Sequence, residues 1–477
     1  MPRATRIFYG LGEFGEGFEG TALDAFLFFF YIQVIGLSGA AVGAAVFIAL
    51  LIDGITNPLV GALSDGLRSR MGRRHPFIFA APLPLAIALF LLFSPPAGGS
   101  TLLLTAWLLG FAILCRIAFA NYFIPHMALG AELTADFDGR LSVAAFRVVF
   151  SYLGRLIALF AAYAFFFHKT TSFANGQLNP AAYPGFALFC SGVILLAILI
   201  SARGTLSRAV LMYKRTPLPD RFSLIHIPRN IGRAFQSRSF CALFVSLLIL
   251  YVTTGVQGAL ALHMNTFFWQ LKTTQIQLVA MSGVAGYIIG VPIASRLGRI
   301  FDKPRVFWSG ILLFFVFTVG PTCLRLMGDF PGPTDPRLPT FLAIAIFLAG
   351  VVGAMPLTVS AAMIADLTDE FELKNGYRTE GFFFGLNAVT RKSSIGLGGA
   401  IAGIAIDWIR FPRHVEPGGV EQVTLNQLAV VYGPTIGVIA VIGLTVMVAY
   451  DLTRSKQKLI AKRLVLQRAE RANLPVR

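Results

Sequence analysis

An ionisable side chain lies in the middle of an apolar stretch of this sequence. Asp53 falls near the centre of residues 40–63, where a charge in a hydrocarbon layer costs at least about 2.5–3.5 kcal/mol. Thr56 and Asn57 follow three and four residues later, so a helix would place all three side chains on one face. One carboxylate with two neutral oxygen donors suits Na⁺ or a single proton. We therefore predict a cation-binding site at these residues; the alternative is a carboxylate in a structural ion pair.

Acidic side chains also occur in the first apolar stretch. Glu19 lies nearer the interior of the bilayer than Glu16 and is a candidate for contact with a substrate. Asp24 lies deeper still, and we expect it either to contact substrate or to pair with Arg147 or Lys392.

Two basic residues lie within later apolar stretches. Arg147 falls about two turns into residues 141–167, and Lys392 falls near the middle of residues 380–409. Either cation could bind substrate hydroxyls or a carboxylate, or could neutralise an acidic partner when the bound cation leaves. The alternative for each is a permanent ion pair between helices.

Neutral side chains complete the predicted substrate site. Asn387 lies one turn before Arg391 and adds an amide to the pocket. Packing or lipid contact accounts for most of the 44 Phe residues, but Phe123 and its neighbour Tyr122 could form an apolar platform for a substrate.

Membrane-spanning helices must position these residues. Only 13% of the 477 residues are charged and 56% are hydrophobic, whereas a soluble domain carries about 25% charged residues. A bilayer crossing needs roughly 20 apolar residues. Twelve apolar stretches meet this need: 18–37, 40–63, 76–95, 101–124, 141–167, 183–202, 239–268, 276–295, 306–327, 339–365, 380–409 and 428–450.

These stretches form a six-plus-six arrangement. We predict an N-terminal six-helix bundle over residues 1–202, a cytoplasmic linker over 203–238 and a C-terminal six-helix bundle over 239–451. Residues 452–477 form a basic cytoplasmic tail of helical character. The predicted fold class is an all-α membrane protein with twelve transmembrane helices in two pseudo-symmetric six-helix bundles.

The placement of basic residues predicts the orientation. Of the 40 Lys and Arg residues, 29 fall in the termini and in loops on the same side, and six fall in loops on the other side. Both termini are therefore expected in the cytoplasm, in a multi-pass protein of the inner membrane. The net charge of +17 sits in these loops and the tail, so the partner that it indicates is the lipid bilayer and no nucleic acid.

A related motif occurs in corresponding loops of the two halves. Gly61 and Asp65 precede a basic cluster that includes Arg73 and Arg74, and residues 296–305 carry a similar set of charges. A Gly, an Asp and a basic cluster can close a helix end and pair with a neighbouring helix terminus. We predict that Asp65, Arg73 and Arg74 form a gating latch that holds the halves together in one conformation. The alternative is a plain basic cytoplasmic loop.

These motifs resemble those of the major facilitator superfamily. More narrowly, nearly all twelve stretches resemble the glycoside–pentoside–hexuronide:cation symporters, the melibiose permease group. The segments that carry the resemblance are Tyr9-Gly-Leu-Gly12, Val34-Ile-Gly-Leu-Ser38, Asp53-Gly-Ile-Thr-Asn-Pro58, Ile124-Pro125 with Glu132, and Asp369-Glu370 with Gly376-Tyr-Arg378-Thr-Glu380-Gly381.

The resemblance implies a cation site on the second helix. Asp53 matches the first of the two cation-site aspartates of the permease, and Asn57 stands where the second would be. A third carboxylate, on the permease's fourth helix, is Phe123 here. Fewer negative charges favour a proton or uncoupled transport over Na⁺, so both Na⁺ and H⁺ remain open as the coupling ion. No other cofactor is expected.

The resemblance also implies a substrate site. The sugar-binding aspartate of the permease's first helix falls at Gly17, which leaves Glu19 as its replacement. Arg147 matches the arginine of the family's fifth helix, and Lys392 matches the lysine of its eleventh helix.

The function implied is cation-coupled symport of a glycoside or small sugar by a monomer, with alternating access to a site between the bundles. One alternative is an anionic or amphipathic substrate, such as a uronide or a lysophospholipid, moved with protons or without coupling. Another is a sensor or scaffold that binds without transport. An enzyme is not expected, because the six His residues are dispersed and no nucleophile–base pair or metal-ligand spacing occurs.

Overall fold

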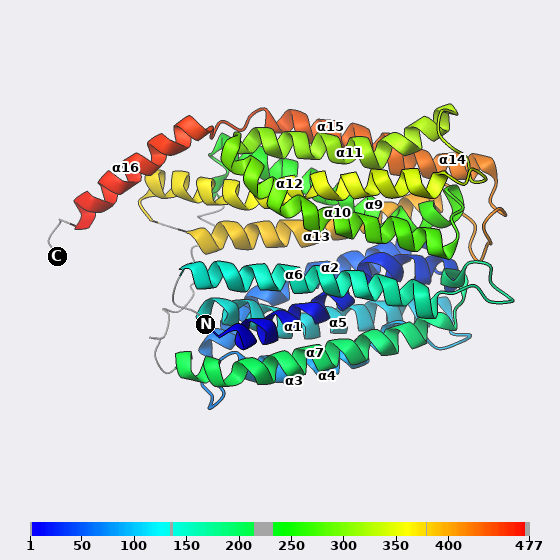
Figure 1. The fold of residues 1–477 in the computed structure, drawn as a ribbon, viewed down its shortest axis with the longest axis horizontal. Helices are drawn as coiled ribbons and strands as arrows, with labels where there is room; N and C mark the ends of the chain where they lie inside the picture. The colour runs from blue at the N-terminus through cyan, green and yellow to red at the C-terminus, as the bar shows by residue number, and fades with distance from the viewer. Residues whose placement is uncertain (1, 134–136, 214–231, 378, 473–477) are drawn as a thin grey trace.

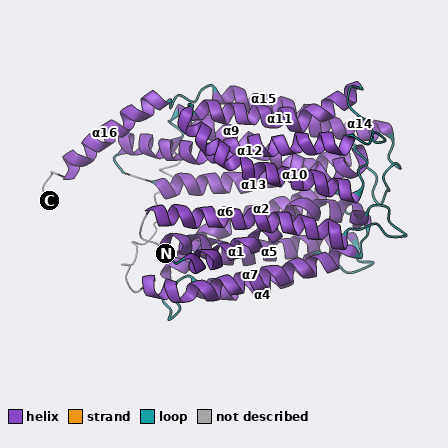
Figure 2. Ribbon diagram, viewed as in Figure 1, coloured by secondary structure: helices purple, strands orange, loops and turns teal. Residues whose placement is uncertain are grey.

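The computed structural model describes residues 2–133, 137–213, 232–377 and 379–472. Within this part of the chain the secondary structure is helical, without strands (Figure 2). Both chain ends lie at the same end of the molecule, which we call the terminal end; the other is the opposite end (Figure 1).

Helices of the N-terminal half fill the lower part of Figure 1. The first span begins as α1 and continues through wider π-helical turns. The bounds are α1 Arg3–Thr21 with turns Ala22–Leu27 and Phe30–Val34, α2 Gly39–Gly66, α3 His75–Ala80, α4 Pro82–Leu92, α5 Thr101–Glu132, α6 Phe137–Ala161 with turn Ala162–Phe166, and α7 Ala182–Tyr213.

Helices of the C-terminal half fill the upper part of the same view. The bounds are α9 Arg238–His263 with turn Met264–Phe268, α10 Thr273–Ile300, α11 Lys303–Met327, α12 Leu338–Asn375, α13 Glu380–Trp408, α14 Gln422–Val430 with turn Val431–Thr435, and α15 Ile436–Met447. Helix α16, Arg454–Ala472, leads away from the bundle (Figure 1).

Among the described residues, ten helices are long and apolar enough to cross a membrane. Two predicted spans fall outside this set, the first span and α13. Both are polar for a reason: α1 and its first wide turn carry Glu13, Glu16, Glu19 and Asp24, and α13 carries Lys392 beside a second basic residue. The described helices therefore confirm an all-α membrane fold, and these charged residues explain why the two spans fall outside the set.

The two halves meet along α2 and α13, and along α6 and α10. Near the opposite end, Gly39 and Gly43 of α2 face Gly403 and Ala400 of α13. A Cβ on Gly403 would overlap the carbonyl oxygen of Gly39. Small residues allow this close approach of helix backbones within a membrane.

The predicted bundle limit at residue 202 differs from the helix boundary. Helix α7 continues to Tyr213, so the first part of the predicted linker is helical. The reason is that Arg203 and the polar residues after it mark where the chain leaves the apolar layer, while the helix itself continues. Residues 214–231 of the predicted linker lie outside the described residues.

Gly403→Ala is expected to loosen the contact between α2 and α13, because the added methyl group meets backbone rather than a side chain that can move. A cysteine at the buried Thr266, in a background without native cysteines, should then react several-fold faster with a maleimide. Gly192→Ala is the matched control, since nothing lies near its added Cβ. Equal labelling rates in both variants would contradict this packing argument.

Candidate functional site

An ion pair joins the two bundles at the middle of α2. The Lys392 ammonium of α13 donates a hydrogen bond to Oδ2 of Asp53. The Asp53 side chain is fully buried and the Lys392 side chain is 16% exposed. Separating such a pair leaves an uncompensated buried charge, which costs several kcal/mol. The predicted cation residue and the predicted substrate-binding lysine are therefore partners.

Oxygen atoms beside this pair lack hydrogen bonds. Oδ1 of Asp53 and Oδ1 of Asn57 are buried without a partner in the described structure, and half-buried Thr56 lies on the same turn. Buried oxygens are seldom left unsatisfied. Such oxygen atoms are suitable ligands for a small hard cation or acceptors for a proton, and the cation site itself stays a prediction.

The acidic residues of the first span face basic residues of α5 and α6. Arg116 Nη1 lies 3.2 Å from Oε1 of Glu19. Arg155 lies 3.1 Å from Glu16 and 3.2 Å from Asp24. The expected pairing of Asp24 with Arg147 or Lys392 is thus wrong. Those two cations are engaged elsewhere, and the arginine two turns further along α6 reaches Asp24 instead.

Close packing of α1 on α6 permits these pairs. A Cβ on Gly17 would overlap the carbonyl oxygen of Ser151, and one on Gly20 would overlap the guanidinium of Arg155. Glu19 is 2% exposed and bound to Arg116, so the structure places it inside the N-terminal bundle rather than at an open surface.

Arg147 faces a carboxylate that sequence reasoning missed. Its Nε lies 3.8 Å from Oε1 of Glu13, which also lies 3.8 Å from Nε2 of His126. Glu13 is 3% exposed. The regular spacing of Glu13, Glu16 and Glu19 was the available signal, since residues three apart share a helix face.

Tyr122 and Phe123 occupy different surroundings. Tyr122 is fully buried and its ring stacks on His126 with centroids 5.0 Å apart. Phe123 is half-buried and stacks on Phe119 at 5.2 Å. Tyr122 is therefore packed inside the N-terminal bundle, away from any open surface, and only Phe123 retains exposure for the predicted platform.

A polar cluster lies where α6, α9, α10 and α13 meet. Tyr251 donates to Oδ1 of Asn387 over 3.4 Å, and the rings of Tyr152 and Tyr287 stack across the bundles at 4.8 Å. Arg391 lies within electrostatic reach of Tyr251 and Tyr287. The arginine is exposed and has no carboxylate partner among the described residues.

The predicted latch residues do come together. Arg74 pairs with Asp65, and Glu132 lies 2.8 Å from Arg73 and 3.0 Å from Arg74. This cluster joins α2, the start of α3 and the end of α5. Among the described residues, the ion pairs of this cluster lie within the N-terminal bundle, so in this conformation it does not hold the two halves together.

The C-terminal bundle repeats this arrangement. Lys303 at the start of α11 donates to both carboxylate oxygens of Asp366 in α12, at 2.7 and 2.6 Å. Both clusters lie at the terminal end and each stays within its own half.

Hydrogen bonds between the halves instead gather at the opposite end. Asp407 of α13 accepts hydrogen bonds from the backbone N–H groups of Gly39 and Ala40, at 3.0 and 2.8 Å. It thereby caps the first turn of α2, whose N–H groups have no partner within the helix. Arg413 adds a hydrogen bond to the carbonyl oxygen of Gly36 over 3.1 Å.

Two glutamine side chains at the opposite end add further hydrogen bonds between the bundles. Gln177 exchanges hydrogen bonds with Thr266 and Thr273, both at 3.2 Å. Gln33 donates to the carbonyl oxygen of Pro412 over 3.3 Å. Among the described residues, the opposite end is therefore closed by contacts between the bundles.

Lys392→Gln is expected to lower the free energy of unfolding by about 3–5 kcal/mol, because it leaves Asp53 buried without its partner. Adding Asp53→Asn should restore most of the loss, since both charges are then removed. Thermal unfolding of the purified variants measures this double-mutant cycle. Strictly additive losses would show that the two residues do not interact.

Comparisons with known proteins place this geometry in a family. The chain is 22% identical to the uncharacterized symporter sll1374 of Synechocystis over 94% of each chain, and 24% identical to the isoprimeverose transporter of Lactiplantibacillus pentosus over 85% of this chain and 80% of that one. Its fold superposes on the inward-open xylose transporter XylE of E. coli with a TM-score of 0.60 at 14% identity, covering 94% and 95% of the two chains. Residues 8–454 match the family model "MFS/sugar transport protein", and the chain belongs to that family of the major facilitator superfamily.

Proposed function

We propose that this protein is a secondary active transporter that carries a glycoside or small sugar together with a cation. The observation that carries the proposal is the buried Asp53–Lys392 pair, which joins the two bundles beside unpartnered oxygens. The names of the relatives, symporters and a sugar transporter, support the same class of substrate.

Alternating access is supported by the difference between the two ends of the molecule: contacts between the bundles gather at the opposite end. The described structure closes the opposite end through Asp407 and Gln177 and keeps both charged clusters of the terminal end within their own halves. The basic residues predict that the terminal end faces the cytoplasm of a cell with this protein in its inner membrane. The described state is then the inward-facing one, and rocking of the bundles exposes the site to the other side.

Cation binding would act on the ion pair. A Na⁺ ion or a proton at Asp53 would compete with Lys392 for the same carboxylate, helped by the unpartnered Oδ1 atoms of Asp53 and Asn57. Once the carboxylate is neutralised, the ammonium can turn to a substrate hydroxyl without leaving a buried charge unpaired. Substrate and cation would then strengthen each other's binding.

Asp53→Asn is expected to abolish the effect of cation on substrate binding. In the wild type, the apparent affinity for a glycoside, obtained from the thermal stabilisation that it causes, should rise roughly 5–150-fold with Na⁺ or at lower pH. Thermal shift of purified protein, over a series of glycosides, Na⁺ concentrations and pH values, measures this. Glu416→Gln, an exposed loop carboxylate, is the control. Glycoside stabilisation of the wild type that ignores both Na⁺ and pH would refute coupling at Asp53.

An acidic sugar is a second candidate substrate. Arg391 is exposed beside Tyr251, Tyr287 and Asn387, and it has no carboxylate partner in the described residues. A guanidinium in this position suits bidentate binding of a carboxylate. Uronides carry such a carboxylate, whereas a neutral glycoside has no charged group to pair with Arg391.

If the substrate is acidic, Arg391→Gln should weaken uronide binding by roughly 10–150-fold, because a hydrogen bond to a charged group contributes about 1.5–3 kcal/mol. Binding of a neutral glycoside should change little. Lys169→Gln in an exposed loop serves as the matched loss of charge. Parallel measurements of both ligands by isothermal titration decide between the two substrates, and an unchanged uronide affinity excludes this role for Arg391.

A further inference from the structure

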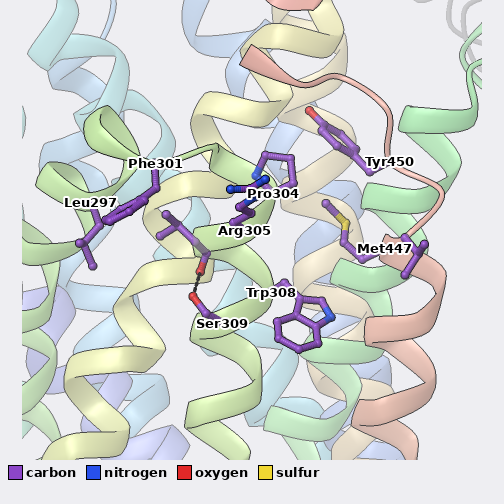
Figure 3. A pocket seen from close by; sticks show the side chains of 10 residues that line it. Leu297, Phe301, Pro304, Arg305, Trp308, Ser309, Met447 and Tyr450 are labelled. Atoms are coloured by element: carbon purple, nitrogen blue, oxygen red, sulfur yellow. Dashed lines mark hydrogen bonds between the residues drawn. The ribbon is translucent and has the colours of Figure 1, made fainter. Parts of the chain in front are cut away.

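Two hollows adjoin on the outer face of the C-terminal bundle, away from the Asp53–Lys392 pair. The first has a volume of about 640 Å³ and lies between α10, α11 and α15. Figure 3 shows its wall, with Phe301 and Leu297 on one side, Met447 and Tyr450 on the other, and Trp308 between them. Its lining is mainly apolar.

The apolar groove lies at the depth of a membrane interface. Helix α10 ends at Ile300 and α11 begins at Lys303, so both helices leave the membrane here. Trp308 lies five residues into α11, roughly 7.5 Å deep at the helical rise of 1.5 Å per residue. Trp and Tyr gather at the level of lipid headgroups. Trp308 and Tyr450 therefore mark the zone where glycerol and the upper acyl chain lie.

The second hollow is basic. It measures about 460 Å³ and shares the lining residues Phe301 and Pro304 with the first, so the two hollows are adjacent. Its basic lining residues are Arg299, Lys303, Arg454 and Lys458. The hollow thus places positive charge directly above an apolar groove.

The charge in this hollow is only partly neutralised. Lys303 is paired with Asp366, which is itself outside the lining. Arg299, Arg454 and Lys458 have no carboxylate partner among the described residues, and the lining contains one carboxylate in the described chain, Asp369. A surplus of positive charge remains for an anionic ligand.

Hydrogen bonds to the ends of α10 and α11 hold the start of α16 beside the basic hollow. Arg454, the first residue of α16, donates to the carbonyl oxygen of Ile300 over 3.3 Å. Gln457 accepts a hydrogen bond from Lys303 over 3.3 Å, and Gln457 and the next residue, Lys458, both line the hollow. The start of α16 therefore forms a fixed wall of the basic hollow.

We propose that these two hollows form a binding site for one anionic phospholipid. Its acyl chain would lie in the groove against Trp308 and Met447, and its phosphate would contact Arg299, Arg454 and Lys458. The adjacency of the two hollows suits a lipid with both a headgroup and an acyl chain, and the surplus of positive charge favours an anionic lipid over a zwitterionic one. The site gives the basic tail a role separate from substrate transport.

The test compares lipid retention in variants of the full-length protein. Delipidated protein is titrated with phosphatidylglycerol or phosphatidylcholine and followed by native mass spectrometry. Arg454→Gln with Lys458→Gln should weaken phosphatidylglycerol binding roughly thirtyfold, at about a factor of five for each lost cation. Lys462→Gln with Arg463→Gln removes the same charge from exposed positions of α16 outside the hollow and should change binding little.

A second readout follows the acyl chain. Phosphatidylglycerol with brominated chains should quench the part of the fluorescence that Trp308→Phe removes, and glycerol 3-phosphate, which lacks the chains, should compete only weakly. Equal losses of binding in both charge variants, equal affinity for phosphatidylcholine, or absence of Trp308 quenching would each overturn the proposal.

Discussion

Asp53 of α2 and Lys392 of α13 form a buried ion pair that joins the two bundles. Both residues would be costly alone in a membrane, and each compensates the other only while α2 and α13 stay together. These helices belong to different bundles. The charge state of the Asp53 carboxylate therefore affects how strongly the two bundles attract each other. Any cation that neutralises Asp53 changes how strongly the bundles are held.

The remaining intramembrane charges have a different task. Glu16, Glu19 and Asp24 form ion pairs with Arg116 and Arg155 within the N-terminal bundle, and glycines of α1 let α6 approach closely enough for the pairs with Arg155. This half can therefore move as a unit. The contacts that must break during such a movement lie at the opposite end, where Asp407 caps α2 across the interface.

Sequence alone predicted the spans and the polar centre of α2, because hydropathy and helical spacing are local properties. Partners were harder to predict. The position of a residue along a span gives its depth in the membrane but not which face of the neighbouring helix it meets. For this reason the predicted partners of Asp24 differ from Arg155, and the prediction omits Glu13. The latch residues were correctly grouped, but which bundle they contact depends on the conformational state. The cap by Asp407 joins residues 368 positions apart and left no local pattern.

In the proposed mechanism, a cation at Asp53 releases Lys392 and so allows the bundles to move. Spin labels at the terminal end, at position 70 of the N-terminal half and position 296 of the C-terminal half, report this movement as a distance measured by pulsed electron paramagnetic resonance. Substrate with Na⁺ or acidic pH is expected to shorten this distance in the wild type and to leave it unchanged in Asp53→Asn. The same shortening in Asp53→Asn, or none in the wild type under any of these conditions, would contradict it.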